Sequence, residues 1–228
     1  MKVRNIVKQK SLQTIIIAGL CLLILGTTAN AEEGGSGHYA AGGVATLIDL
    51  APTAPGLIVQ PLYLHYNGSA GKSKTIPVAN LIAVDLDATI DALTLGGIYT
   101  FEQPVLGAHY SVGIYVPYMM MDVTATVTGK TGTVSQTDSV DGIGDVTLIP
   151  VMLAWKSDVW QFNALLPIYA PTGDYEVGRL ANAGLNYWTV DPTVGVSYAN
   201  EKTGLNFALH TGITFNTENN DTNYRSGS

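Results

Sequence analysis

The sequence predicts an all-β protein: an antiparallel up-and-down transmembrane β-barrel, incomplete in this chain, that follows an N-terminal signal peptide. Apolar and polar residues alternate with a period of two over segments as long as the roughly ten residues that a tilted strand needs to cross a bilayer. Charged residues make up only 13% of the chain, against about 25% in soluble domains. Beyond the extreme N-terminus, no apolar run reaches the about 20 residues of a membrane-spanning helix.

The composition excludes several classes of protein. A mean hydropathy of +0.22 and a hydrophobic content of 46% exclude a disordered chain, which is poor in apolar residues and rich in charge. The formal net charge of -7 argues against a nucleic-acid-binding protein, which needs a basic surface. We therefore expect no nucleic acid among the partners.

Residues 1–31 have the three parts of a secretory signal peptide. Four basic residues within the first ten positions precede the apolar run 15–25, and residues 29–31 (ANA) form an A-x-A cleavage site. The run is too short for a transmembrane anchor, and Leu20 stands before Cys21 where a lipoprotein signal needs a small residue. We expect Sec-dependent export and a mature chain without cysteine, which excludes disulfides and cysteine-based zinc sites.

The next segment, 32–56, is rich in glycine and contains the short apolar run 44–50. It is interpreted as a plug inside the barrel, with an additional, eighth strand as the alternative. The remaining residues, 57–228, form the predicted partial outer-membrane β-barrel.

The alternation is clearest in the segments 107–116, 160–170, 188–198 and 205–215. Phe162 on one face, for example, is followed by Asn163 on the other. A soluble β-sandwich shows the same alternation with its apolar face inward. The barrel is favoured because the polar faces carry small and mostly uncharged side chains, and because Trp155 and Trp160 stand near segment ends, where barrels have aromatic girdles.

Seven strands follow from this pattern: 57–66, 76–101, 107–128, 145–156, 159–170, 186–198 and 204–216. Long outer loops are expected at 67–74, 129–144 and 171–185, and short turns between the other strands. In the second and third strands the parity of the apolar residues changes midway, which predicts β-bulges near Asp91 and Pro117. Since single-chain barrels close with an even number of strands, we expect an incomplete barrel that lacks several strands.

Five prolines lie inside the predicted strands, although proline removes a ladder hydrogen bond. Three of them, Pro150, Pro167 and Pro192, fall near the outer ends of neighbouring strands. Missing hydrogen bonds would weaken the wall there, so these three form a candidate lateral gate through which an apolar solute would leave into the membrane. Ordinary kinking of the strands is the alternative.

The polar faces of the strands supply a candidate lining of the lumen. It serves either as a path for a solute or as a side-chain network that fills and stiffens the barrel. The candidate residues are His109, Ser111, Tyr115, Gln161, Asn163, Tyr169, Asp191, Thr193, Asn206 and His210. Four acidic residues share the inward parity and either repel anions from the lumen or form a solvated outer rim. These are Asp85, Asp87, Asp91 and Asp122.

Other chemistry finds little support in the sequence. His109 and Ser111 share a face but lie about 7 Å apart along a strand, too far for a Ser–His pair. The four histidines lack metal-ligand spacing, the glycines of 142–144 suit a turn better than a nucleotide loop, and 218–221 suits a solvated loop better than a Ca²⁺ site. We expect no catalytic residue, no metal and no cofactor.

Several motifs along the mature chain resemble one family. Residues 37–43 (GHYAAGG) resemble a G-H-Y-x-P-G start with Ala41 in place of proline, and 141–145 (DGIGD) resemble a G-x-G-D turn before a strand. Similar matches occur at 166–175, which ends in a P-T-G-x-Y pattern, at 186–192 and at 216–222. These motifs resemble the meta-pathway phenol degradation protein family.

The resemblance implies an outer-membrane barrel, longer than this chain, that is associated with the catabolism of phenol or other aromatic compounds and has no assigned catalytic residues. The expected function is an outer-membrane channel or transporter for small hydrophobic compounds, aromatic ones in particular. A structural or adhesive barrel without transport is the alternative, and an outer-membrane enzyme is disfavoured. The expected partners are the lipid bilayer of the outer membrane, a small hydrophobic solute and the barrel-assembly machinery.

Overall fold

The structure is a computed structural model that describes residues 37–38, 51–78, 81–129 and 132–227. The chain divides into two units, Met1–Asn30 and Ala31–Ser228, and the described residues all belong to the second. The predicted signal peptide, 1–31, and most of the glycine-rich segment lie outside the described residues. Within the described part of the chain the regular elements are all strands, and no helix there is long and apolar enough to span a membrane.

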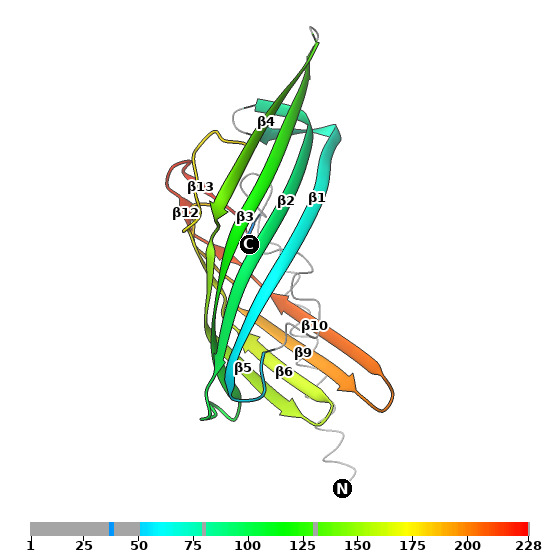
Figure 1. Ribbon diagram of the computed structural model, residues 1–228, viewed down its shortest axis with the longest axis vertical. Helices are drawn as coiled ribbons and strands as arrows, with labels where there is room; N and C mark the ends of the chain where they lie inside the picture. The colour runs from blue at the N-terminus through cyan, green and yellow to red at the C-terminus, as the bar shows by residue number, and fades with distance from the viewer. Residues whose placement is uncertain (1–36, 39–50, 79–80, 130–131, 228) are drawn as a thin grey trace, which may run out of the picture. The chain divides into compact units, whose positions relative to one another are not determined.

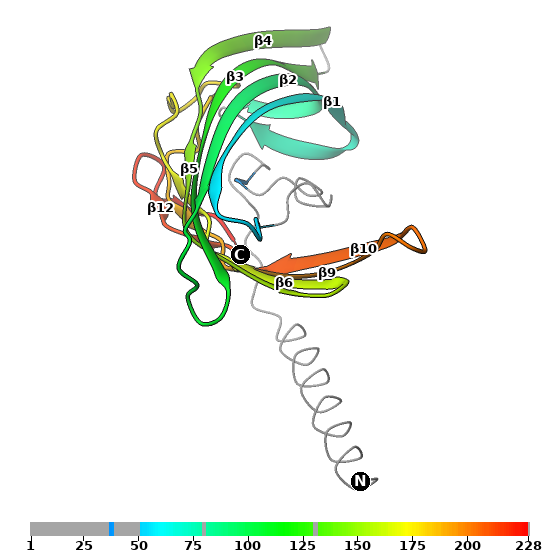
Figure 2. The same ribbon diagram turned by 60° about the horizontal axis from the view of Figure 1, so that its bottom comes forward.

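One strongly curled antiparallel sheet dominates this unit, and Figures 1 and 2 show its convex outer face and concave inner face. A small hairpin, β12 with β13, lies outside this sheet. The strands are β1 (Gly56–Val78), β2 (Leu81–Thr100), β3 (His109–Gly129), β4 (Gly132–Ile143), β5 (Val146–Ser157), β6 (Trp160–Leu165), β7 (Ile168–Ala170), β8 (Thr189–Val190), β9 (Thr193–Asn200), β10 (Leu205–Gly212), β11 (Phe215–Asn216), β12 (Glu218–Asn219) and β13 (Tyr224–Arg225).

The sheet has seven antiparallel positions side by side, which confirms the predicted fold class. The first three are β1, β2 and β3, and each later position is shared by two consecutive strands: β4 with β5, β6 with β7, β8 with β9, and β10 with β11. The result is a half-barrel. The predicted loops at 67–74 and 129–144 are wrong. β1 continues to Val78, and β4 pairs with residues 118–129 of β3.

The two predicted β-bulges are also wrong. The β2–β3 ladder runs without a register shift from Asp85, opposite Thr126, to Thr100, opposite Ser111. Asp91 and Pro117 both lie inside this uninterrupted ladder. The change of parity in the sequence therefore needs another explanation.

That explanation is an inversion of polarity along continuous strands. In the C-terminal half of β2, the outer face of the sheet carries the exposed side chains of Leu93, Leu95 and Tyr99. In the half that leads to the long loops, the outer face carries Asp87, while Leu86 of the inner face packs in a core. Apolar residues thus change faces along a continuous strand, and no residue is inserted.

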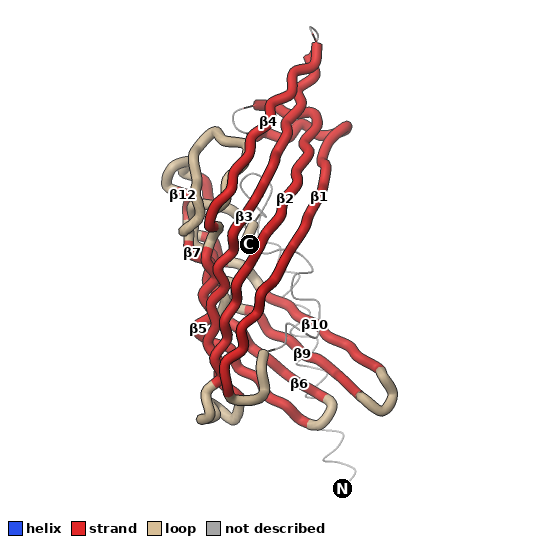
Figure 3. Tube along the Cα trace, in the orientation of Figure 1, coloured by secondary structure: helices blue, strands red, loops and turns tan. Residues whose placement is uncertain are grey.

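Two apolar clusters occupy the inner face at different positions along the strands: the lower cluster near the short turns and the upper cluster near the long loops. The lower cluster comprises Ala51, Ile98, Ile149, Met152 and Ala154, with Tyr115 and Leu165 against it. The upper cluster comprises Val123, Val140, Ala181 and Ala183. The two alanines of the upper cluster come from the long segment 171–188, drawn as a loop in Figure 3, so this loop covers the inner face of the upper half.

The ladder is disturbed along one line that crosses four neighbouring positions, here called the proline seam. Pro150 lies at a register shift between β3 and β5, Pro167 in the gap between β6 and β7, and Pro192 in the gap between β8 and β9. The line continues at 213–214, between β10 and β11. Backbone hydrogen bonds at 2.9 Å, such as Asp191 N–H to the Pro167 carbonyl, still connect the strands there.

Candidate functional site

Polar side chains line the inner face of β6, β9 and β10. Asn163 of β6 lies opposite Gly195 of β9, which in turn lies opposite His210 of β10. The faces differ sharply in exposure: Asn163 is 3% exposed, whereas its outward-facing neighbours Phe162 and Val194 are 49% and 56% exposed. The inner wall is therefore polar and enclosed, and the outer wall is apolar and open, as the alternation predicts.

Asn163 and His210 meet over Gly195. A Cβ atom at position 195 would lie 2.4 Å from Asn163 Oδ1 and 2.7 Å from His210 Nδ1, so only glycine leaves room for both side chains. Asn163 Oδ1, Asn163 Nδ2 and His210 Nε2 are buried and have no hydrogen-bond partner among the described residues. We call Asn163, Gly195 and His210 the inner-wall trio.

Further polar residues extend the inner wall on both sides of the trio. On one side, Gln161 donates a hydrogen bond of 2.8 Å from Nε2 to the carbonyl of Ala51, which belongs to the lower cluster. On the other side, Thr193 lies 3.3 Å from Asp191 Oδ1, next to a second glycine position, Gly212. The structure thus brings together five of the predicted lumen residues: four on the adjacent strands β6, β9 and β10, and Asp191 just before β9. The four on the strands are Gln161, Asn163, Thr193 and His210.

The other predicted lumen residues lie elsewhere. Ser111 on β3 shares a hydrogen bond of 2.8 Å with Thr100, not with His109. Tyr115 donates a hydrogen bond of 2.8 Å to Gln60 Oε1 and packs against the lower cluster. Asn206 lies near the exposed β9–β10 turn. The part of the inner face near β3 is therefore filled by side chains.

A second buried polar cluster surrounds His38, which the sequence analysis did not select as a site residue. Its Nε2 lies 2.8 Å from Asp145 Oδ2 and its Nδ1 2.7 Å from Thr189 Oγ1. The ring stacks on Tyr169 with a centroid distance of 4.9 Å. The side chains of His38 and Asp145 are only 5% and 6% exposed. This cluster attaches residue 38 to the start of β5 and to β8.

The donors in the His38 cluster can be counted. Thr189 donates its single hydroxyl proton to Asn216 Oδ1 at 2.6 Å, because the Asn216 amide nitrogen donates to the Gly227 carbonyl. Thr189 must therefore accept from His38 Nδ1, while His38 Nε2 donates to the Asp145 carboxylate. Asp145 also accepts from the backbone N–H groups of 173 and 185. The buried Asp145 carboxylate is thus held by the His38 ring and by two backbone N–H groups.

The four acidic residues do not point into the lumen. Asp85, Asp87, Asp91 and Asp122 lie on the outer face, at positions opposite Thr126, Thr124, Met120 and Thr89. Asp122 accepts a hydrogen bond of 2.5 Å from Ser139 on the outer face of β4, and Asp91 accepts from Tyr63 and His65 of β1. The inward assignment is wrong because it assumed a bulge that the ladder does not contain. The geometry therefore fits the alternative prediction, in which these four residues form an outer rim.

Ring and charge contacts complete the ends of the sheet. Trp160 and Tyr198 meet edge to face with a centroid distance of 4.9 Å near the short turns. In the long loop, Arg179 donates a hydrogen bond of 2.9 Å to Asp174, and this contact raises the pKa of the guanidinium. No group of three or more His, Cys, Asp and Glu side chains in the described part of the chain could hold a metal ion.

Two features of the sequence could have pointed to the sites that were missed. His38 stands in the 37–43 motif and Asp145 ends the 141–145 motif, but their pairing is a tertiary contact between residues 107 positions apart. Gly195 interrupts an otherwise regular alternation of Val194 and Val196 with small polar residues. Its role follows only from the register that places it between Asn163 and His210.

Comparison with known proteins identifies a family. The family model described as "Putative MetA-pathway of phenol degradation" matches residues 68–228. No curated protein and no solved structure matches the chain. The matched region contains the inner-wall trio, the proline seam and Asp145.

Proposed function

Since the chain belongs to the family described as "Putative MetA-pathway of phenol degradation", we propose that it is an outer-membrane channel or transporter for small hydrophobic compounds, aromatic ones in particular. The proposal includes insertion of the half-barrel into the outer membrane after export. It also includes the lipid bilayer and the barrel-assembly machinery as partners, and conduction of a solute without chemical conversion.

The observation that carries this proposal is the polarity of the outer face. Exposed apolar side chains cover it on neighbouring strands, among them Leu95 on β2, Val116 on β3 and Phe162 on β6. Soluble proteins rarely leave a continuous apolar surface of this kind in water. The same face becomes acidic and hydroxyl-rich at Asp87 and Asp122, which suits a strand that leaves the hydrocarbon layer.

The inner face supports transport of a small solute. Its polar residues on β6, β9 and β10 offer hydrogen-bonding groups, whereas a purely structural barrel would gain more from an apolar or fully paired interior. The proline seam supports a sideways exit, because Pro150, Pro167 and Pro192 all coincide with disturbed pairing. We include this lateral gate in the proposal.

A second candidate function, a structural or adhesive barrel without transport, is favoured by one observation. The lower cluster fills the inner face near β2, β3 and β5 with Ile98, Ile149 and Met152. A lumen packed in this way along all strands would leave no path for a solute.

Uptake measurements separate the two functions. Cells that lack the gene, and the same cells with the full-length chain restored, are given radiolabelled toluene at micromolar concentration. We expect slower uptake without the gene and recovery on restoration. Equal uptake in both strains would contradict the transport proposal and leave the structural barrel as the better account.

A further inference from the structure

The inner-wall trio contains three buried polar atoms that have no hydrogen-bond partner in the described part of the chain. Nine in ten or more buried polar groups in proteins have a partner, so an amide with both of its polar atoms buried and unpaired needs an explanation. Asn163 has both Oδ1 and Nδ2 in this condition, and His210 Nε2 lies on the other side of the same glycine. We propose that Asn163 and His210 bind the hydroxyl group of a phenolic solute over Gly195.

The donors and acceptors match a neutral hydroxyl. The Asn163 amide can donate through Nδ2 and accept through Oδ1, and the imidazole Nε2 of His210 can do either according to its tautomer. A phenol hydroxyl donates one hydrogen bond and accepts another, so it satisfies two of the three atoms at once. Asp191, on the same inner wall, disfavours a phenolate or a carboxylate at this position.

The surroundings suit an aromatic ring attached to that hydroxyl. Ala154 lies opposite Asn163 on the neighbouring strand and presents only a methyl group there. Leu165, two residues from Asn163 on the same face, packs against the lower cluster. Small and apolar neighbours of this kind favour a flat apolar body over a sugar or a peptide.

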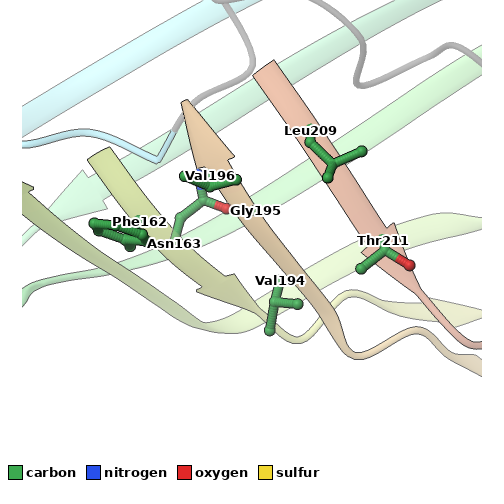
Figure 4. A pocket seen from close by; sticks show the side chains of 7 residues that line it. All are labelled: Phe162, Asn163, Val194, Gly195, Val196, Leu209 and Thr211. Atoms are coloured by element: carbon green, nitrogen blue, oxygen red, sulfur yellow. The ribbon is translucent and has the colours of Figure 1, made fainter. Parts of the chain in front are cut away.

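The location of the trio links it to the proposed exit. Asn163 and Gly195 precede and follow the seam prolines Pro167 and Pro192 by a few residues on adjacent strands. On the other side of the wall, Phe162, Val194 and Leu209 line a shallow apolar groove of about 300 Å³ that also reaches Asn163 and Gly195 (Figure 4). A solute held by its hydroxyl on the inner face is thus separated from the apolar outer groove by β9, which carries no side chain at Gly195.

This inference deepens the proposed function and rests on it. It predicts a preference for phenol over toluene, which has almost the same shape but no hydroxyl. The full chain, folded in detergent, is titrated with phenol and with toluene by ligand-observed NMR. We expect phenol to bind about tenfold more tightly, which corresponds to about 1.4 kcal/mol. Equal affinities in the unaltered protein would overturn the site and indicate that ordered water satisfies these atoms.

Two variants test the residues, and a third is their matched control. Asn163→Leu and His210→Leu should each remove most of the preference while toluene binding changes less than twofold. Ser197→Ala alters a buried polar residue of the same inner wall outside the trio and should keep the preference. If all three lose phenol binding equally, or none does, the assignment of the hydroxyl to the trio is wrong.

The uptake assay with toluene keeps the two proposals apart. If the protein carries toluene but binds phenol no more tightly than toluene, the transport proposal stands and the hydroxyl site is refuted. If the protein prefers phenol in detergent but cells with and without the gene take up toluene and phenol equally, the hydroxyl site stands and the transport proposal is refuted.

Discussion

An arginine in place of Leu95 is the most direct test of the polarity inversion. Leu95 lies on the outer face of β2, is 60% exposed and has Pro61 and Val116 as its paired neighbours. At the midplane of a bilayer, arginine on the lipid face of a barrel costs about 2–4 kcal/mol. On a water-exposed surface the same substitution changes stability by only about 0.5 kcal/mol. The two environments therefore predict clearly different results.

Asp87 provides the matched control, because it lies on the same strand and the same face beyond the inversion. The free energy of unfolding is measured by urea titration of the protein folded into phospholipid vesicles, for the unaltered chain, Leu95→Arg and Asp87→Arg. We expect a loss of about 2–4 kcal/mol for the first variant and less than about 1 kcal/mol for the second. Equal losses in both variants, or no loss in Leu95→Arg, would refute the bilayer interpretation of the outer face.

Three further predictions concern the inner face. Asp145→Asn replaces the buried carboxylate that contacts His38 and accepts from two backbone N–H groups, and should destabilise the fold by about 1–3 kcal/mol, measured by thermal unfolding; an unchanged midpoint would show that the cluster is not structural. Gly195→Ala places a Cβ 2.4 Å from Asn163 Oδ1. The NMR signals of the Asn163 side-chain amide and of the His210 ring should therefore shift, while those of β1 stay unchanged. Ala125→Asp puts a charge at a site 1% exposed and should cost at least about 2 kcal/mol, whereas Thr124→Asp on the outer face should be tolerated, and the reverse order in urea unfolding would contradict the assigned faces.

Local pattern was sufficient to predict the class of fold and most of the strands. Alternation with a period of two identifies which residues share a face wherever one environment extends along the whole strand, as it does around Phe162 and Val194. The breaks at Pro167 and Pro192 were visible too, because proline cannot donate to a ladder whatever its surroundings.

The pattern failed where the apolar residues change faces along a continuous strand. Periodicity reports the difference between two faces but not which face is the inner one, so the change near Asp91 looked like an inserted residue. The same ambiguity placed the four acidic residues inside the lumen. The β3–β4 hairpin was missed for a related reason, since polar residues on both β4 and the outer half of β3 resemble a loop in composition.

The candidate site was predictable as a set of residues but not as an arrangement. Asn163 and His210 were both identified from their polar parity, 47 positions apart in the chain, and nothing local relates one to the other. Only the pairing of β6 with β9 and of β9 with β10 brings them to one glycine. The contact between His38 and Asp145 depends in the same way on the completed sheet.

The attachment of His38 also constrains the order of assembly. Its two hydrogen-bond partners lie 107 and 151 positions further along the chain. The residues that surround it come from the start of β5 and from β7, β8 and β11. Closing loops of this length costs entropy that local strand pairing does not. We therefore expect residue 38 to dock only after the later strands have joined, which makes protection of the His38 ring a reporter of the finished wall.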